Sequence, residues 1–195
     1  LQLTFLLAAP CALALFIFGE PLAAVLYHYG KFNALDVMMT QRALALAPDN
    51  SGAHLNLSIC DLLRGDFASG FARYEWRWQT DQLRGAARDF LRPLWLGAES
   101  LNGKSILLHA EQGLGDTLQF CRYAPLLKQQ GARVVLEVQA PLMPLLSGMN
   151  GVDVLVSQGD ALPPTDFHCP LLSLPLAMKT TLANVPNPEH YVVAP

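Results

Sequence analysis

The sequence predicts an α/β fold, in which a Rossmann-like parallel sheet over residues 105–195 follows a helical segment and one membrane-type helix. Three observations predict it. An apolar run at 106–108 ends in a loop with two glycines and a new helix-like segment, as at the first strand of an open α/β sheet. Strand-like and helix-like segments then alternate, which favours parallel strands joined by right-handed crossovers. Residues 1–29, by contrast, carry one formal charge, Glu20.

The amino-terminal run from Leu1 to Phe18 is almost wholly apolar and just reaches the length of a membrane-spanning helix. Pro10 would kink such a helix, which membrane helices tolerate. Residues 22–29 read as an interfacial stretch with aromatic side chains. A secretory signal peptide, weakened by the missing basic start and initiator Met, and a buried core helix are the alternatives. We therefore expect an inner-membrane association through residues 1–29 and a cytoplasmic location for residues 45–195.

Composition argues against several classes of partner and cofactor. The chain has 13 basic and 16 acidic residues, so no electrostatic footprint suggests a nucleic acid. The cysteines form no CxxC pair and the histidines lack the spacing of metal ligands. We expect no disulfide framework, no metal and no resident cofactor. The four cysteines are Cys11, Cys60, Cys121 and Cys169.

Residues 41–84 have the pattern of packed helices. A helix ends at Pro48, and a second begins near Ser51 with apolar residues at helical spacing. An aromatic stripe, which indicates packing, follows at Phe67, Phe71, Tyr74 and Trp78. Residues 85–104 read as an irregular connector with a tight turn before the first strand.

The helical segment at residues 41–84 resembles a tetratricopeptide repeat. The 34-residue pattern of that repeat places apolar, turn, small and aromatic residues at Leu57, Gly65, Gly70 and Tyr74. It departs from that pattern at Ser58, where Gly is usual. One and a half repeats cannot bury their own faces, so we expect them to pack on the following domain.

The α/β segment is expected to contain strands at 105–109, 133–138, 153–156 and 167–168, with another starting at 191. Helices are expected at 116–130, ended by Gly131, and at 142–147. Residues 172–178 are apolar and broken by Pro175.

The loop after the first strand supplies the candidate site. Asp116 is either a general base or an acid that caps the new helix. Gly113 and Gly115 would admit a phosphate or a sugar, and at least one is expected to need a positive φ or a close backbone approach. Thr117 and Leu118 follow where GxGxxG would continue toward a third glycine, which disfavours a dinucleotide site.

Other polar residues near this loop are candidates for substrate binding. Each of them has an alternative explanation. Gln119 is equally well explained as a solvated surface residue. Arg122 is explained by an ion pair with Asp116 or Glu111, and His168 by a structural role. His109 is expected in the core. The full set of substrate-binding candidates is Glu111, Gln112, Gly113, Gly115, Thr117, Gln119, Arg122 and His168.

Residues 1–44 resemble one stretch of the MurJ/MviN lipid II flippase family. The resemblance is carried by residues 5–10, 20–22, 27–36 and 39–44. That family is a bundle of many transmembrane helices. The resemblance therefore implies a fragment that cannot form a central cavity or flip lipid by itself.

Residues 45–195 are similar to bacterial tetratricopeptide-repeat glycosyltransferases, which are related to the heptosyltransferase-like GT-B enzymes. The similarity is carried by residues 74–78, 93–95, 107–123 and 168–175. It implies the first of two Rossmann-like domains, which takes the acceptor, while the second holds the nucleotide sugar. Asp116 would be the catalytic base for transfer to a protein or glycan hydroxyl. The chain stops at Pro195, about where the linker to the second domain would begin, so we expect this piece alone to transfer no sugar.

The predicted organisation is thus a flippase-like helix and loop at 1–40, repeat helices at 41–84, a connector at 85–104 and an acceptor domain at 105–195. The two resemblances meet in mid-helix near residues 41–46, which favours a rearranged or misassembled reading frame. Two alternatives stay open: a fragment of a flippase-type transporter, and a non-catalytic binding module built on the repeat surface.

Overall fold

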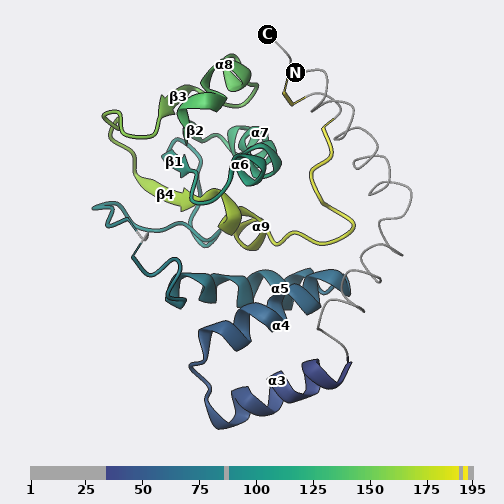
Figure 1. Ribbon diagram of the computed structural model, residues 1–195. Coiled ribbons are helices and arrows are strands. Elements are labelled where there is room, and N and C mark those ends of the chain that lie inside the picture. The colour runs from purple at the N-terminus through teal and green to yellow at the C-terminus, as the bar shows by residue number, and fades with distance from the viewer. Residues whose placement is uncertain (1–33, 86–87, 189–190, 193–195) are drawn as a thin grey trace, which may run out of the picture. The chain divides into compact units, whose positions relative to one another are not determined.

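The computed structural model describes residues 34–85, 88–188 and 191–192, and it divides into two compact units, 1–57 and 58–195 (Figure 1). The predicted membrane-type helix at 1–29 lies outside the described residues. Within the described ranges, no helix has both the length and the apolar character needed to cross a membrane.

The described part of the first unit is helical. Helix α3 covers Ala34–Leu46, and α4, Ser51–Leu63, begins in this unit and continues past its boundary. The side chain of Asn50 starts α4, because its Oδ1 accepts the backbone N–H of Ala53 at 3.0 Å. Both helices confirm the helical reading of this segment.

In the second unit the end of α4 packs tightly on α5, Phe67–Tyr74, which continues into the 3₁₀ helix η1, Glu75–Gln79. A Cβ at Gly70 would lie 2.7 Å from Cγ and Cδ2 of Leu62, so only glycine fits this approach. The hydroxyl of Ser58 donates to the carbonyl of Gly70 at 2.7 Å. The helices are confirmed, whereas their membership of a tetratricopeptide repeat stays a prediction.

A four-stranded parallel sheet forms the centre of the described part of the second unit, in the order β3-β2-β1-β4. Its strands are β1 (Ser105–His109), β2 (Arg133–Val138), β3 (Val154–Ser157) and β4 (Phe167–Pro170). The predicted α/β class and parallel sheet are confirmed.

Beyond β4, Leu94 of the connector forms a parallel bridge with His168. Pro93 O accepts from His168 N at 3.0 Å and Trp95 N donates to His168 O at 2.8 Å. The connector therefore covers the outer edge of β4 with part of a further strand.

The helical elements of this unit are short. They are α6 (Leu114–Phe120), η2 (Cys121–Tyr123), α7 (Ala124–Gln129), η3 (Ala140–Leu142), α8 (Met143–Leu146), η4 (Leu171–Ser173) and α9 (Leu174–Ala177).

The single helix predicted at 116–130 is wrong in its start and its continuity. It begins at Leu114, and Pro125, which lacks an N–H, opens a new α segment after the 3₁₀ turn η2. Its predicted end is confirmed, since Gly131 has φ +86°. Likewise Pro175 lies in the first turn of α9 and starts that helix rather than breaking it.

The strand boundaries show smaller differences. β3 is shifted by one residue toward the carboxyl end, and β4 extends two residues beyond the expected pair. Tyr191 and Val192 lie in a bend, so the strand expected from 191 is wrong for these two residues, while Val193 lies outside the described part.

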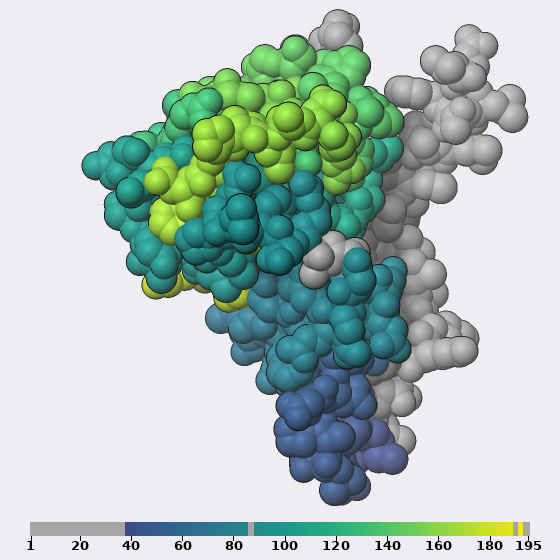
Figure 2. Space-filling view, turned by 90° about the vertical axis from the view of Figure 1, so that its left-hand side faces the viewer, coloured from purple at the N-terminus to yellow at the C-terminus, as the bar shows by residue number. Residues whose placement is uncertain are grey.

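The two faces of the sheet bury different clusters. Helices α6 and α7 lie beside one face (Figure 1), where the large core includes Ile106, Leu108 and Val134. On the other face the core is small, and it is covered by Phe90 of the connector and Leu162 of the β3–β4 loop. Figure 2 shows the surfaces of these two segments, teal and yellow-green, side by side.

Candidate functional site

The order of the strands predicts where a ligand would approach. The chain proceeds from β1 outward to β2 and β3, then returns to the opposite side of β1 with β4. The loops after β1 and β4 therefore leave the sheet in different directions, and open α/β sheets bind ligands at such a point, beyond the carboxyl ends of the strands.

The turn after β1 is built around Gly113 and Asp116. Gly113 has φ −69° and ψ 166°, and its N–H donates to Asp116 Oδ2 at 2.9 Å. Its carbonyl accepts from the backbone N–H of Thr117 at 3.2 Å. Asp116 thus caps α6, which is one of the two roles expected of it. Among the described residues no partner occupies its Oδ1, which leaves one carboxylate oxygen for another group.

Neither glycine of this turn has the predicted backbone constraint. Gly115 is absent from the glycines with positive φ among the described residues, and a Cβ there would meet nothing within 4 Å. A Cβ at Gly113 would lie 3.2 Å from Asp116 Oδ2, a tight contact with the capping carboxylate. The expectation that at least one of these glycines needs a positive φ or a close backbone approach is therefore wrong. Gly113, Leu114 and Gly115 form an exposed rim.

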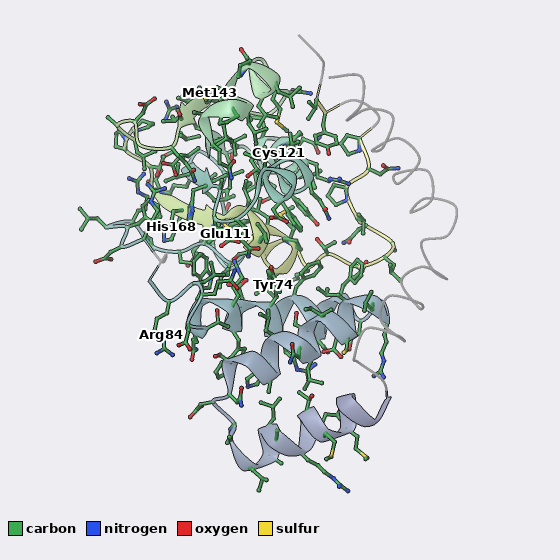
Figure 3. All side chains as sticks on the ribbon, viewed as in Figure 1. Tyr74, Arg84, Glu111, Cys121, Met143 and His168 are labelled. Atoms are coloured by element: carbon green, nitrogen blue, oxygen red, sulfur yellow. The ribbon has the colours of Figure 1, made fainter. Side chains whose placement is uncertain are left out.

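The buried side chain of Arg77 lies between the loop that follows β1 and the segment that follows β4. Nη2 of Arg77 donates to Glu111 Oε1 and Oε2 at 3.0 Å each and to Ser173 Oγ at 2.8 Å. Nη1 donates to Glu75 Oε1 at 2.7 Å. The guanidinium also lies 4.9 Å from the centre of the Tyr74 ring. Figure 3 labels Tyr74 and Glu111, which come from α5 and the β1 loop.

Burial raises the pKa of Glu111 to about 7, against the attraction of Arg77. Because this carboxylate is held by Arg77, it fastens the β1 loop to η1 and is not exposed on the rim. Sequence reasoning made Glu111 a candidate for substrate binding and missed Arg77, for which no local pattern gave a signal.

A chain of amide hydrogen bonds fixes the remaining side of the loop. Gln112 Nε2 donates to the hydroxyl of Tyr74 at 3.2 Å. Gln139 Nε2 donates to Gln112 O at 2.9 Å, and Thr117 Oγ1 donates to Gln139 Oε1 at 2.9 Å. Gln158 Nε2 donates to Ala110 O at 3.2 Å. Sequence reasoning missed both Gln139 and Gln158.

A signal for the two missed glutamines was present in the sequence. Gln139 directly follows β2 and Gln158 directly follows β3. Since carboxyl ends of parallel strands meet at one edge, polar residues at these positions are expected beside the β1 loop.

His168 lies away from this rim, on the sheet face covered by Phe90. Its ring stacks at 5.5 Å from that of His109, and its Nδ1 lies 3.3 Å from His109 Nε2. The pKa of His109 is lowered to about 3 by burial and then by His168 and Arg88. Burial also lowers the pKa of His168, so the pair is neutral near pH 7. Both rings pack on Phe90, which supports the structural reading of both residues.

Gln119 lies near the carboxyl end of α6 and Arg122 lies in η2, so both are at the opposite end of this helix from the turn. Arg122 Nε donates to Gln119 O at 2.6 Å, and its guanidinium lies 5.2 Å from the Tyr191 ring. Both residues line a cavity shared with α5. The structure thus brings Glu111, Gln112, Gly113, Gly115, Asp116 and Thr117 together in one loop and turn, and places Gln119, Arg122 and His168 elsewhere. In the described part, no cluster of His, Cys, Asp and Glu is arranged to hold a metal.

Comparison with known proteins bears on the amino-terminal segment. The family model of the lipid II flippase MurJ matches residues 1–47. The lipid II flippase MurJ of Burkholderia cenocepacia is 64% identical over 45 residues, which are 23% of this chain and 9% of that protein. A probable lipid II flippase MurJ of Buchnera aphidicola is 49% identical over 41 residues, 21% of this chain and 8% of that protein. No solved structure matches the chain.

These matches confirm the predicted likeness of residues 1–44 to the flippase family. The chain spans less than a tenth of the length of these relatives. The matched segment ends at residue 47, ahead of the α/β unit, whose likeness to glycosyltransferases stays a prediction.

Proposed function

We propose that the α/β unit is the acceptor-binding half of a two-domain glycosyltransferase, with the exposed turn at residues 113–116 as the acceptor site. The observation that carries the proposal is the position of this turn. It follows the central strand β1 at the reversal of strand order, and it presents a carboxylate oxygen of Asp116 without a partner among the described residues.

In this proposal Asp116 acts as general base. An acceptor hydroxyl on a protein or glycan hydrogen-bonds to Oδ1 and attacks the anomeric carbon of a nucleotide sugar. The new C–O bond forms as the bond from that carbon to the nucleotide diphosphate breaks, and the hydroxyl proton passes to Asp116. The hydrogen bond from Gly113 to Oδ2 orients the carboxylate for this step.

The buried network supports the proposal by fixing the loop. Arg77 donates to the side chain of Glu111, and Gln139 donates to the backbone carbonyl of Gln112. These bonds hold the turn rigid and do not occupy its exposed atoms. A rigid turn places the base with little loss of conformational freedom during reaction, and positioning contributes much of an enzyme's rate. In this proposal the nucleotide sugar binds to a second domain that faces the turn.

The test compares two proteins: the 195-residue chain, and the same chain joined at its carboxyl end to a nucleotide-sugar domain of a GT-B glycosyltransferase. UDP-, GDP- and ADP-sugars are supplied with a peptide and oligosaccharide mixture, and release of the nucleoside diphosphate is measured. We expect turnover only by the joined protein and none after Asp116→Asn. Turnover by the chain alone would overturn the assignment to the acceptor half, and a fully active Asp116→Asn variant would place the base elsewhere.

A second candidate function rests on residues 1–47 and their match to the flippase family. We propose that this segment directs the chain to the membrane, since it is apolar and resembles a segment of lipid II flippases. Transport itself would require the many further helices of that family, so targeting is the function that the match supports best.

A further inference from the structure

A cavity of about 380 Å³ lies in the second unit, between the end of α4, α5 and the α6–η2 segment. Figure 1 shows α5 below α9 and α6. The walls of this cavity are largely apolar. They include Ile59 and Leu63 from α4, Phe71 from α5, and Phe120 and Tyr123 from the α/β side. This volume is within the range of sites that bind small molecules, which are roughly 300–1,000 Å³.

A second cavity of about 280 Å³ adjoins the first. The two share Phe67, Phe71 and Thr180 in their walls, and the rings of the two phenylalanines are 5.4 Å apart in an edge-to-face arrangement. The two cavities therefore lie next to each other beside α5, and together they are called the channel below.

The charges on this channel are all of one sign. Arg122 lines the first cavity and Lys179 lines the second, and the described lining residues include no Asp or Glu. The nearby carboxylate of Asp61 is paired with Arg73, and that of Asp66 caps α5. The channel therefore complements a ligand that is apolar along its length and negative at one end.

Arg122 retains hydrogen-bonding capacity for such a ligand. Its Nε donates to Gln119 O at 2.6 Å, Nη1 to Pro186 O at 3.4 Å and Nη2 to the hydroxyl of Tyr191 at 3.4 Å. A guanidinium has five N–H donors, so one on each terminal nitrogen is uncommitted. No ion pair joins Arg122 to a carboxylate of the described residues. N–H donors of a charged guanidinium form strong, charge-assisted hydrogen bonds with a carboxylate.

We propose that this channel binds a free single-chain fatty acid, with the alkyl chain along Phe67 and Phe71 and the carboxylate on Arg122. The apolar walls and the positive sign of the lining charges favour an amphiphile with one alkyl chain and a negative head group. The site is separate from the turn at 113–116 and does not depend on the glycosyltransferase proposal.

The test measures binding of dodecanoate, dodecanol and dodecyltrimethylammonium to the full chain by calorimetry. The two ions are kept below their critical micelle concentrations and dodecanol below its solubility limit. We expect dodecanoate to bind at least tenfold more tightly than the other two, because only it pairs with the guanidinium. Arg122→Gln should weaken dodecanoate binding at least tenfold, the effect of losing one charge-assisted hydrogen-bond pair. Ile59→Trp, which fills the cavity from a half-exposed position, should remove binding of all three probes.

Arg84→Gln is the matched control, because Arg84 also donates to a backbone carbonyl, that of Gln79, and lines neither cavity. Its dodecanoate affinity should be unchanged. If Arg122→Gln fails to fold, Leu63→Glu, at an exposed wall position, should reverse the preference from dodecanoate to the cation.

Three outcomes would overturn the proposal. Equal binding of all three probes would show an apolar cavity without anion preference. Dodecanoate binding unaffected by Ile59→Trp would place the ligand elsewhere, the apolar residues 1–18 included. Self-association by sedimentation that Ile59→Trp abolishes would identify a second copy of the chain as the occupant.

Discussion

Arg77 and Glu111 lie 34 residues apart in sequence and form a bidentate contact, with Nη2 of the arginine 3.0 Å from each carboxylate oxygen. The arginine is 1% exposed and the glutamate side chain 3%. This pair fastens the loop after the central strand to the 3₁₀ helix that ends the helical segment. Removing one partner leaves an uncompensated buried charge.

Arg77→Leu should therefore lower the free energy of unfolding by about 3–5 kcal/mol, as expected when a buried ion pair loses one member. Urea unfolding followed by tryptophan fluorescence measures it. Arg73→Leu is the control, since Arg73 pairs with Asp61 at a partly exposed position, and its loss should cost about 1 kcal/mol or less. A similar small effect for both variants would mean that the buried pair does not hold the loop.

Glu111 should also make stability depend on pH. Burial raises its pKa in the folded protein to about 7, above the ordinary value of 4.5 that applies when unfolded. Folding thus favours the protonated form, so the contribution of this group is full below pH 4.5 and is lost as the pH rises to 7. Unfolding measured from pH 4.5 to 7 should show this decline in the wild type and less of it in Glu111→Gln. An unchanged pH profile in the variant would assign the decline to other groups.

The glycines divide into those that need to be glycine and those that do not. Gly115→Ala should be neutral or stabilising by up to about 1 kcal/mol, because the position is helical and a Cβ there meets nothing. Gly151→Ala should cost about 1–3 kcal/mol, because Gly151 has φ +83° and a Cβ would lie 2.5 Å from Pro125 Cα. Thermal unfolding of both variants measures the contrast. A destabilised Gly115→Ala would mean that the turn has a conformation other than the one described.

One substitution separates the observed capping role of Asp116 from its proposed role as a base. Asp116→Asn retains an oxygen that can accept the N–H of Gly113, so the melting temperature should change little. Asp116→Ala removes the cap and should cost about 1 kcal/mol. If Asp116→Asn unfolds the protein, the carboxylate charge is structural and the assignment of a base fails.

The amino-terminal segment makes a prediction of its own. Residues 1–29 have a single formal charge and lie within the match to the flippase family. Expression of the chain with and without residues 1–40 should place the longer protein in the membrane fraction and the shorter one in the supernatant. Equal, high solubility of both proteins would contradict the targeting role.

Local patterns were sufficient for the bounds of the two central strands, β1 and β2. The apolar run at 106–108 and the β-branched run at 134–135 predicted β1 and β2 at their observed bounds, because a strand buried on both faces reads as a continuous apolar stretch. The helix after β1 was placed two residues late because its cap comes from Asp116, inside the first turn, rather than from a side chain before it.

The candidate site was only partly predictable. The turn at 113–116 is local and was recognised, whereas the pairing of Arg77 with Glu111 depends on tertiary packing that no spacing encodes. Gln119 and Arg122 were grouped with the turn by nearness in sequence. The helix carries them instead to the cavity beside α5.

The most direct test of the proposed acceptor site is a titration of the ¹⁵N-labelled chain with a panel of oligosaccharides, followed by amide chemical shifts. Binding at the turn predicts the largest shifts at the exposed rim of Gly113, Leu114 and Gly115 and at the adjoining Asp116. Saccharide-dependent shifts that avoid these four amides, or no shift with any member of the panel, would contradict the account.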